Sequence, residues 1–165
     1  TKTTQTRPAG PKTVALGADA LSLYDPYKNA TASGDPADAD DNNGDTAWFV
    51  TSRNASSMGV GLLVDLESPR GIKTVGIVTR TPGFRVEVYG ADKELPTDVL
   101  DTRWSHIRDR SRVDETATEG TKAGDKMERI VLGGGSSKYR YILLWFTAPP
   151  DKGPTVRLTQ VVLQA

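Results

Sequence analysis

A run of oxygen-bearing side chains at residues 38–48 is the first feature of this sequence that could perform chemistry. The run is DADDNNGDTAW, in which Asp carboxylates and Asn amides precede a tryptophan. The calcium loop that joins two helices requires oxygen ligands at positions 1, 3 and 5, glycine at position 6 and glutamate at position 12. Counted from Asp38, position 6 is Asn43 and position 12 is Phe49, so this motif is absent. The stretch is therefore either a cation-binding loop of another kind or a solvated acidic turn.

A second polar stretch, WSHIRDRSRV at residues 104–113, combines an aromatic ring with a histidine and several arginines. In an extended chain, alternation places one set of side chains on a single face: Trp104, His106, Arg108, Arg110 and Arg112. Arginine binds carboxylates and phosphates through two parallel hydrogen bonds, and a neighbouring aromatic ring can stack on a sugar. The pattern indicates a site for an anionic glycan, a peptidoglycan stem carboxylate or a pyrophosphate headgroup. The alternative is a solvated loop in which aspartates compensate the arginines.

Catalytic motifs are scarce. The chain has no cysteine, and its one histidine, His106, has no evident nucleophile partner. No serine lies in a G-x-S-x-G sequence, and GGGSSK at residues 133–138 does not match the phosphate-binding loop pattern G-x-x-x-x-G-K-S/T. We expect the glycine-rich segment to be a turn between strands, and we expect the protein not to be an enzyme.

The composition is that of a globular domain with no general affinity for polyanions. Of 165 residues, 36% are hydrophobic, and 21 basic residues balance 21 acidic ones to give a net charge of zero. Nucleic acid is therefore not an expected partner. No apolar run approaches the roughly 20 residues that a membrane-spanning helix requires.

Short segments with β-type patterns follow one another along most of the chain. We expect strands near 59–66, 72–79, 84–90, 127–133, 139–147 and 155–164. In the third of these, Phe84, Val86 and Val88 alternate with polar neighbours; in the last, Val156 and Leu158 share a face with Gln160. With sixteen glycines and ten prolines in the chain and no helical periodicity, the pattern predicts an all-β sandwich. Residues 1–13 are predicted to be a flexible tether, and residues 14–165 a single domain.

Several of these segments together resemble the discoidin, or coagulation-factor type C, domain of the galactose-binding-like jelly-roll superfamily. The matching segments are NGDTAW (43–48), GVGLLVDLESPRGIKTVGIVT (59–79), FRVEVYGAD (84–92), Trp104 and YRYILLWFT (139–147). The sequence is most similar to the extracytoplasmic C-terminal domain of mycobacterial-type MviN (MurJ-like) proteins, which contain a peptidoglycan-precursor flippase and a pseudokinase. The resemblance implies a jelly-roll β-sandwich in which Trp48 is a core residue. Trp145 is likewise expected in the core or on the sheet surface.

In this superfamily the loop before the Thr-x-Trp segment commonly holds a structural calcium ion. The resemblance assigns this role to Asp45, with Asp41 and Asp25 as neighbouring ligands. The sequence departs from the usual pattern at two positions, where Asn43 replaces an aspartate and Gln160 replaces a glutamate of the last strand. A structural Ca²⁺ and a plain acidic turn both remain open.

The resemblance also implies a function: a non-catalytic, extracytoplasmic binding or sensing module of a membrane-anchored protein of peptidoglycan biosynthesis. Its partner would be a cell-wall glycan or precursor, contacted by Trp104, His106, Arg108 and Arg110. The alternative is a docking or spacer domain that binds a protein and no sugar.

Overall fold

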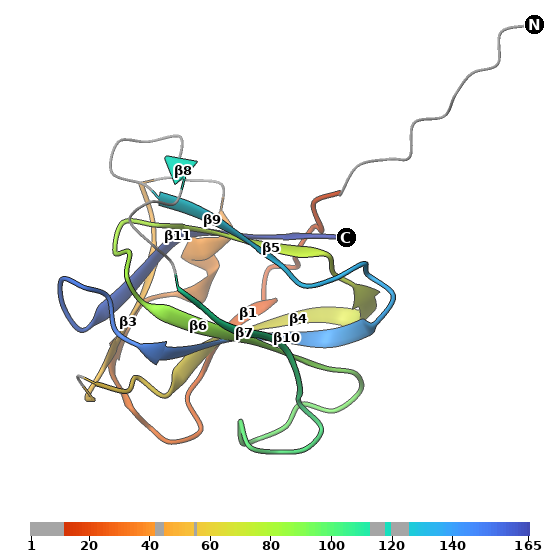
Figure 1. Ribbon diagram of the computed structural model, residues 1–165, viewed down its shortest axis with the longest axis horizontal. Coiled ribbons are helices and arrows are strands. Elements are labelled where there is room, and N and C mark those ends of the chain that lie inside the picture. Colours follow the sequence, from red (N-terminus) through yellow and green to blue (C-terminus); the bar gives the residue numbers. More distant parts are fainter. Residues whose placement is uncertain (1–11, 42–44, 55, 113–117, 120–125) are drawn as a thin grey trace, which may run out of the picture.

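The computed structural model describes residues 12–41, 45–54, 56–112, 118–119 and 126–165. These residues form strands and one short 3₁₀ helix, η1 (Pro36–Ala39), and include no α-helix (Figure 1). The strands are β1 (Leu21–Tyr24), β2 (Ala30–Ser33), β3 (Trp48–Ser52), β4 (Val60–Gly71), β5 (Thr74–Thr79), β6 (Arg85–Ala91), β7 (Ser105–Arg112), β8 (Thr118–Glu119), β9 (Lys126–Val131), β10 (Lys138–Ala148) and β11 (Thr155–Gln164).

The strands pair into two antiparallel sheets that face each other. One sheet has the order β1-β4-β10-β6-β7, and the other has the order β2-β3-β11-β5-β9-β8. Figure 1 shows the sheets stacked, with β10, β6 and β7 in one layer and β11, β5 and β9 in the other. This is the arrangement of a jelly-roll sandwich, so the predicted all-β fold is confirmed.

The space between the sheets holds the main core. Alternation along β6 sends Val86 and Val88 inward, together with Phe84 just before the strand, and all three are fully buried, as the sequence predicts. Phe146 lies at the centre of this core, with ring centroids 6.0 Å from Trp48 and 5.5 Å from Phe84. The prediction that Trp48 is a core residue is confirmed, because its side chain is inaccessible to solvent.

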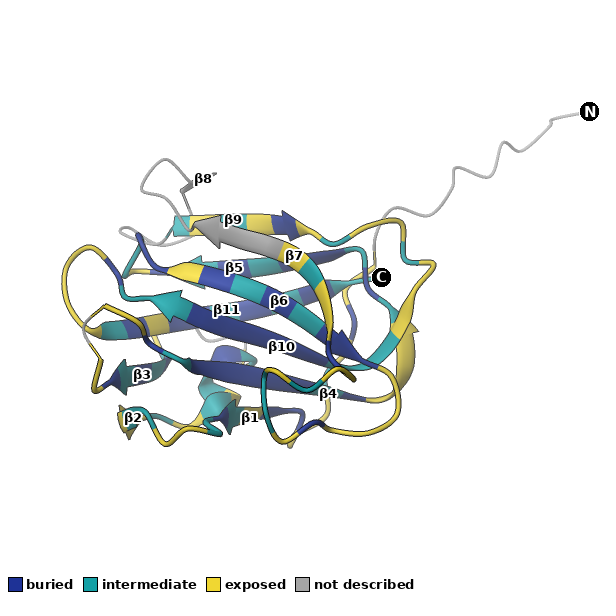
Figure 2. Cartoon of the chain, turned by 60° about the horizontal axis from the view of Figure 1, so that its bottom comes forward, coloured by how far each residue is buried: buried dark blue, intermediate teal, exposed yellow. Residues whose placement is uncertain are grey.

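A second, smaller hydrophobic cluster lies on the outer face of the five-stranded sheet. It comprises Tyr24, Leu63, Ala91, Trp104, Leu143 and Trp145. Figure 2 shows this face, where the central strands are largely buried beside the connection between β6 and β7. Residues 60–64 of β4 and 142–146 of β10 are therefore buried on both faces, which explains the continuous apolar runs in these segments. Trp145 is buried on the sheet surface, as predicted.

Irregularities in the pairing of β11 change which residues share a face. In β11 the register shifts between Leu158 and Gln160, and Val161 and Leu163 are buried beyond that point. The prediction that Gln160 shares the face of Val156 and Leu158 is therefore wrong, because a bulge inserts one residue and reverses the alternation.

The predicted single face of β7 stays a prediction, because the side chains of residues 109–112 lie outside the described ones. The pairing of β7 with β6 shifts register twice, between the partners of Val86 and Val88 and between those of Val88 and Tyr89. Each shift interrupts the pairing, so alternation by itself does not establish a common face for these residues. In addition, residue 104 precedes the strand rather than belonging to it.

The N-terminal boundary lies slightly earlier than predicted. Lys12 and Ala165 exchange two backbone hydrogen bonds of 3.1 and 2.9 Å, and Thr13 forms a bridge with Gln164. These two residues, expected in the tether, are thus paired with the end of β11; the rest of the predicted tether, residues 1–11, lies outside the described residues. No helix in the described part of the chain is long and apolar enough to cross a membrane.

Candidate functional site

Loop 92–104, which connects β6 and β7, determines the shape of the outer face of the five-stranded sheet. The hairpin pairs Tyr89 with His106 and Gly90 with Ser105, and the loop then folds back across the sheet. Its tip is held by Tyr24, whose hydroxyl donates to the Pro96 carbonyl oxygen at 2.7 Å and accepts from Trp104 Nε1 at 3.3 Å. Burial raises the pKa of this tyrosine, so it remains a neutral donor.

An aromatic pair lies on the exposed side of this hairpin. The rings of Tyr89 and His106 have centroids 4.9 Å apart with planes inclined by 41°. The Tyr89 hydroxyl donates to Glu87 Oε2 at 2.8 Å, and its ring meets the edge of Trp104 at 6.4 Å. His106 is exposed, whereas Trp104 is only 6% exposed. The pair is therefore a partly open surface supported by a buried indole.

Arg103, at the base of the same hairpin, is held in place by two carboxylates. Its guanidinium donates to Asp101 Oδ2 at 2.7 Å and to Glu94 Oε2 at 2.5 Å, and about half of the arginine side chain is exposed. The hydrogen bonds from Arg103 lower the pKa of Asp101 to about 2. A cavity of about 340 Å³ is lined by Asp92, Lys93, Glu94 and Arg103. A cation with remaining donor capacity thus faces an open hollow.

Tyr27 marks the opposite edge of the loop. Its ring is 42% exposed and meets the edge of Trp145 at a centroid distance of 6.0 Å. Its hydroxyl donates to Asp98, which raises the pKa of Tyr27 to about 12. The pKa of Asp98 is lowered, first by the Leu100 amide and then by Tyr27. The outer-face site, as we define it, comprises Tyr27, Tyr89, Glu94, Arg103 and His106.

The structure brings only part of the sequence-predicted binding set to the surface. His106 and Arg108 are exposed on β7. Trp104 lies beneath the loop as a support, and the side chain of Arg110 lies outside the described residues. The assignment of these four residues to ligand contacts stays a prediction.

Sequence reasoning missed Tyr27, Tyr89 and Arg103. Tyr89 alternates in sequence with the inward-facing Val86 and Val88, and Arg103 immediately precedes the polar stretch, so both were within reach of the pattern. Their proximity to His106 depends on the hairpin register and on the course of the loop, which no local pattern specifies.

The predicted calcium ligands have other contacts. Asp25 accepts hydrogen bonds from the amides of Asn29 and Ala30, at 2.8 and 3.1 Å, and so shapes the β1–β2 connection. Asp41 accepts a hydrogen bond from the hydroxyl of Thr46. Among the described residues, no three His, Cys, Asp or Glu side chains form a group that could hold a metal ion, so Asp25, Asp41 and Asp45 do not constitute one. Residues 42–44 of this loop lie outside the described residues, and the calcium hypothesis stays a prediction.

Comparison with known proteins identifies the fold. No family model matches the sequence, and no curated protein matches it. Among solved structures, the family 32 CBM (carbohydrate-binding module) of NanJ from Clostridium perfringens, in complex with galactose, superimposes with a TM-score of 0.61 at 15% identity. That alignment covers 93% of this chain and 100% of the module.

Two further structures show the same similarity. Chitosan-binding module 1 of a chitosanase/glucanase from Paenibacillus sp. IK-5 has a TM-score of 0.63 at 11% identity, covering 93% of this chain and 99% of that one. Truncated AlyQ, with CBM32 and alginate lyase domains, has a TM-score of 0.65 at 12% identity. There the alignment covers 94% of this chain but only 34% of the AlyQ chain. These neighbours share the galactose-binding-like jelly-roll fold; they do not test the resemblance to MviN-type proteins.

Proposed function

We propose that this domain is a non-catalytic carbohydrate-binding module and that the outer-face site contacts the sugar. The observation that carries the proposal is the arrangement of the β6–β7 hairpin. It presents the partly open Tyr89–His106 ring pair on the paired strands and the Arg103 cavity on the loop that joins them. The fold is shared with a module solved in complex with galactose and with one described as chitosan-binding.

Each part of the site suits one element of sugar recognition. Aromatic rings supply apolar area at low entropic cost, and the Tyr89–His106 surface suits the apolar face of a pyranose. The Arg103 guanidinium, already oriented by Asp101 and Glu94, suits hydroxyl or carboxylate oxygens. The cavity of about 340 Å³ is at the lower end of the roughly 300–1,000 Å³ range of small-molecule sites.

For the biological ligand we propose a cell-wall glycan or a peptidoglycan precursor. This part rests on the sequence resemblance to the extracytoplasmic domain of MviN-type proteins. It would place the domain outside the cytoplasmic membrane, as part of a membrane-anchored protein of cell-wall synthesis.

The direct test is co-sedimentation of the purified domain with isolated cell-wall sacculi, at low and at moderate salt. We expect retention of the wild-type domain at both salt concentrations and at least tenfold weaker binding of the Arg103→Ala and His106→Ala variants. Both side chains are exposed, so the melting temperatures should hardly change. Lys152→Ala, at an exposed position of the β10–β11 turn, is the matched control and should bind like the wild type.

Equal retention of all variants would contradict the assignment of the site. Absence of retention at either salt concentration, combined with no binding on an array of soluble glycans, would contradict carbohydrate binding altogether.

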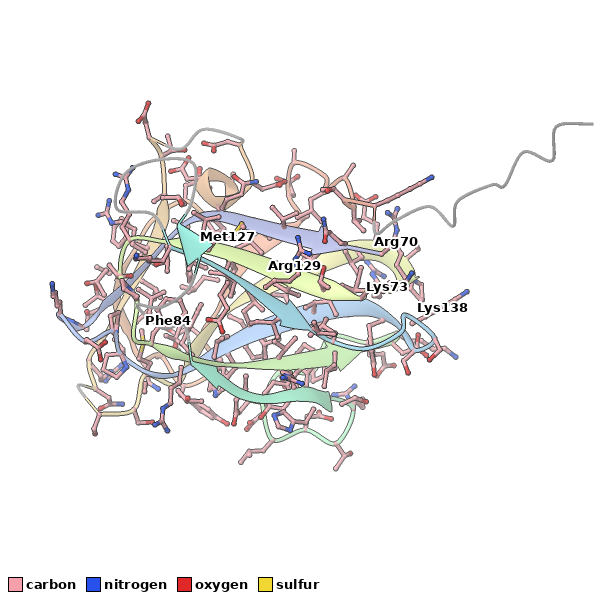
Figure 3. The ribbon with its side chains drawn as sticks, turned by 45° about the horizontal axis from the view of Figure 1, so that its top comes forward. Arg70, Lys73, Phe84, Met127, Arg129 and Lys138 are labelled. Carbon is pink, nitrogen blue, oxygen red and sulfur yellow. The ribbon has the colours of Figure 1, made fainter. Side chains whose placement is uncertain are left out.

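The alternative, a protein-docking domain, is favoured by one observation on the six-stranded sheet. Its outer face exposes Met127 and Val131, at 39% and 55%, beside the half-buried Val78. Figure 3 shows Met127 on β9 at this face. Should sacculi and glycans fail to bind, Met127→Lys and Val131→Lys are the variants with which to examine a protein partner.

A further inference from the structure

Two turns pack tightly together where β4 passes into β5 and β9 passes into β10. The Leu132 amide donates to the Lys73 carbonyl oxygen at 2.7 Å, joining residues 71–73 to residues 132–137. A Cβ atom on Gly71 would lie 2.0 Å from the Gly135 carbonyl oxygen, so only glycine permits this approach. Gly135 itself has φ +82°, in the region that favours glycine. The GGGSSK segment is thus a fixed turn with a specific neighbour, rather than an unattached linker.

This packing leaves a small recess. A cavity of about 90 Å³ is lined by Ile72, Ile107, Leu132, the residues 133–137 and Tyr139. Its lining combines the apolar side chains of Ile72, Ile107 and Leu132 with a glycine-rich turn and two serines. The hollow is sized for one small chemical group rather than for a whole sugar ring.

Four basic residues belong to the strands and turns that adjoin the recess, outside its lining: Arg70, Lys73, Arg129 and Lys138. We call them the basic patch. Lys138 pairs with Gly71 and Arg70 pairs with Tyr139 across adjacent strands, and Lys73 Cγ lies 3.2 Å from the Cβ position of Gly135. Arg129 lies on β9, opposite Gly76 of β5. Figure 3 shows Arg70, Lys73 and Lys138 at one end of the sandwich, with Arg129 nearby on β9.

The side chains of the basic patch differ from Arg103 and Arg140 in forming no ion pair with any carboxylate that the structure describes. Arg103 and Arg140 each form ion pairs with carboxylates. No such pair joins the basic patch to any Asp or Glu of the residues that the structure describes. In a chain with zero net charge, four cations gathered without compensation form a local positive field that attracts an anion.

We propose that the basic patch and the 133–137 turn form an oxyanion site, separate from the outer-face site, for a carboxylate or phosphate group carried by an acidic glycan. Lysine and arginine donate to the oxyanion from several sides, and the glycine backbone admits its close approach. The apolar part of the lining accommodates the carbon to which the oxyanion is attached. The recess favours one discrete group over a flat membrane surface, which would contact protruding side chains only. The choice of a glycan as carrier rests on the proposed function; the oxyanion site itself does not.

The experiment compares a glycan with and without its charge. Oligogalacturonate and its methyl ester differ only in the carboxylates, and binding of each to the intact chain is measured by calorimetry at two salt concentrations. We expect wild-type protein to bind oligogalacturonate at least tenfold more tightly than the ester, with a marked loss at higher salt. The double variant Lys73→Gln/Lys138→Gln should lose this preference and keep its affinity for the ester. Lys152→Gln is the charge-matched control and should behave like the wild type.

The outcomes separate this proposal from the proposed function. Equal affinity of wild type for acid and ester, or an unaltered preference in the double variant, overturns the oxyanion site while leaving sugar binding intact. If neither glycan binds, inorganic phosphate is titrated while the amide resonances of Lys73 and Gly134 are followed by NMR. Saturable shifts that the double variant lacks would support the oxyanion site and contradict the carbohydrate function; no shifts would overturn the site. A further outcome is that the protein binds neither glycan but sediments with phosphatidylglycerol vesicles, and that this binding requires Lys73 and Lys138. That result would overturn the proposal that a glycan carries the oxyanion.

Discussion

At the scale of single residues, glycines at close contacts and carboxylates beside arginines determine how the turns and the loop are held. Gly71 is required by the approach of Gly135, whereas Gly134 has nothing within 4 Å of its Cβ position. Asp101 and Arg103 show the corresponding electrostatic effect, because each stabilises the charged form of the other. Both effects can be tested by conservative substitutions.

Gly71→Ala should destabilise the domain by about 1–3 kcal/mol, because the added methyl group forces the two turns apart. Gly134→Ala, in the same turn but with open space around it, should change the free energy of unfolding by less than about 0.5 kcal/mol. Urea denaturation of both variants measures the difference. Equal stabilities would show that the two turns are not packed as described.

The Asp101 carboxyl should titrate with a midpoint near pH 2, because its pKa is about 2 and is lowered mainly by the Arg103 side chain. A carboxyl whose pKa is lower in the folded state stabilises that state above its unfolded pKa, which is about 3.9. This contribution is fully present above about pH 4 and is lost as the pH falls toward 2. Carboxyl NMR titration measures the midpoint, and Arg103→Ala should move it upward. An unchanged midpoint in that variant would contradict the pairing.

At the scale of elements, loop 92–104 is the connection on which the outer-face site depends. The hydroxyl of Tyr24, more than seventy residues away in sequence, bonds both the Pro96 carbonyl and the Trp104 indole of this loop. Removing that hydroxyl leaves a buried indole N–H without its acceptor, and the loop should open more often.

Tyr24→Phe should therefore accelerate tryptic cleavage after Lys93 and Arg103 several-fold, at a cost of about 1–3 kcal/mol in stability. Tyr139→Phe is the matched control, because no hydrogen bond of its hydroxyl is present within the described part of the chain. Mass spectrometry of the early fragments identifies the cleavage sites. Equal cleavage rates in the two variants would show that Tyr24 does not anchor the loop.

At the scale of the whole molecule, the two hydrophobic clusters share their strands. Leu62 and Leu144 face the main core, while Leu63 and Leu143 belong to the outer cluster. Because β4 and β10 carry both clusters, the clusters should unfold together as one cooperative unit.

Tryptophan fluorescence can test this cooperativity, since Trp48 reports on the main core and Trp145 on the outer cluster. Two variants are needed, each of which retains one of these tryptophans and carries phenylalanine at the other tryptophan positions. In each variant, the urea transition measured by fluorescence should coincide with the transition measured by far-ultraviolet circular dichroism. A transition of the Trp145 reporter that precedes the loss of secondary structure would contradict a single cooperative unit.

Local pattern was sufficient for much of this architecture. Alternation identified the inward face of β6 at Phe84, Val86 and Val88, and the mixture of short apolar runs with turn residues indicated a β-sandwich. The burial of Trp48 was also predictable from the resemblance. These features are local or nearly so, because the alternation of side chains along a strand depends only on the sequence of that strand.

Other features were decided only by tertiary structure. The bulge of β11 reversed the predicted face of Gln160, and β7 shifts register twice against β6, because register depends on the partner strand rather than on the strand's own sequence. Trp104 is buried because loop 92–104 covers the sheet, where its indole N–H donates to the Tyr24 hydroxyl. Arg70, Lys73 and Lys138 lie in one patch because two turns that are far apart in sequence pack together at Gly71 and Gly135. Alternation specifies which side chains are apolar, but contacts between segments far apart in sequence specify which polar side chains meet.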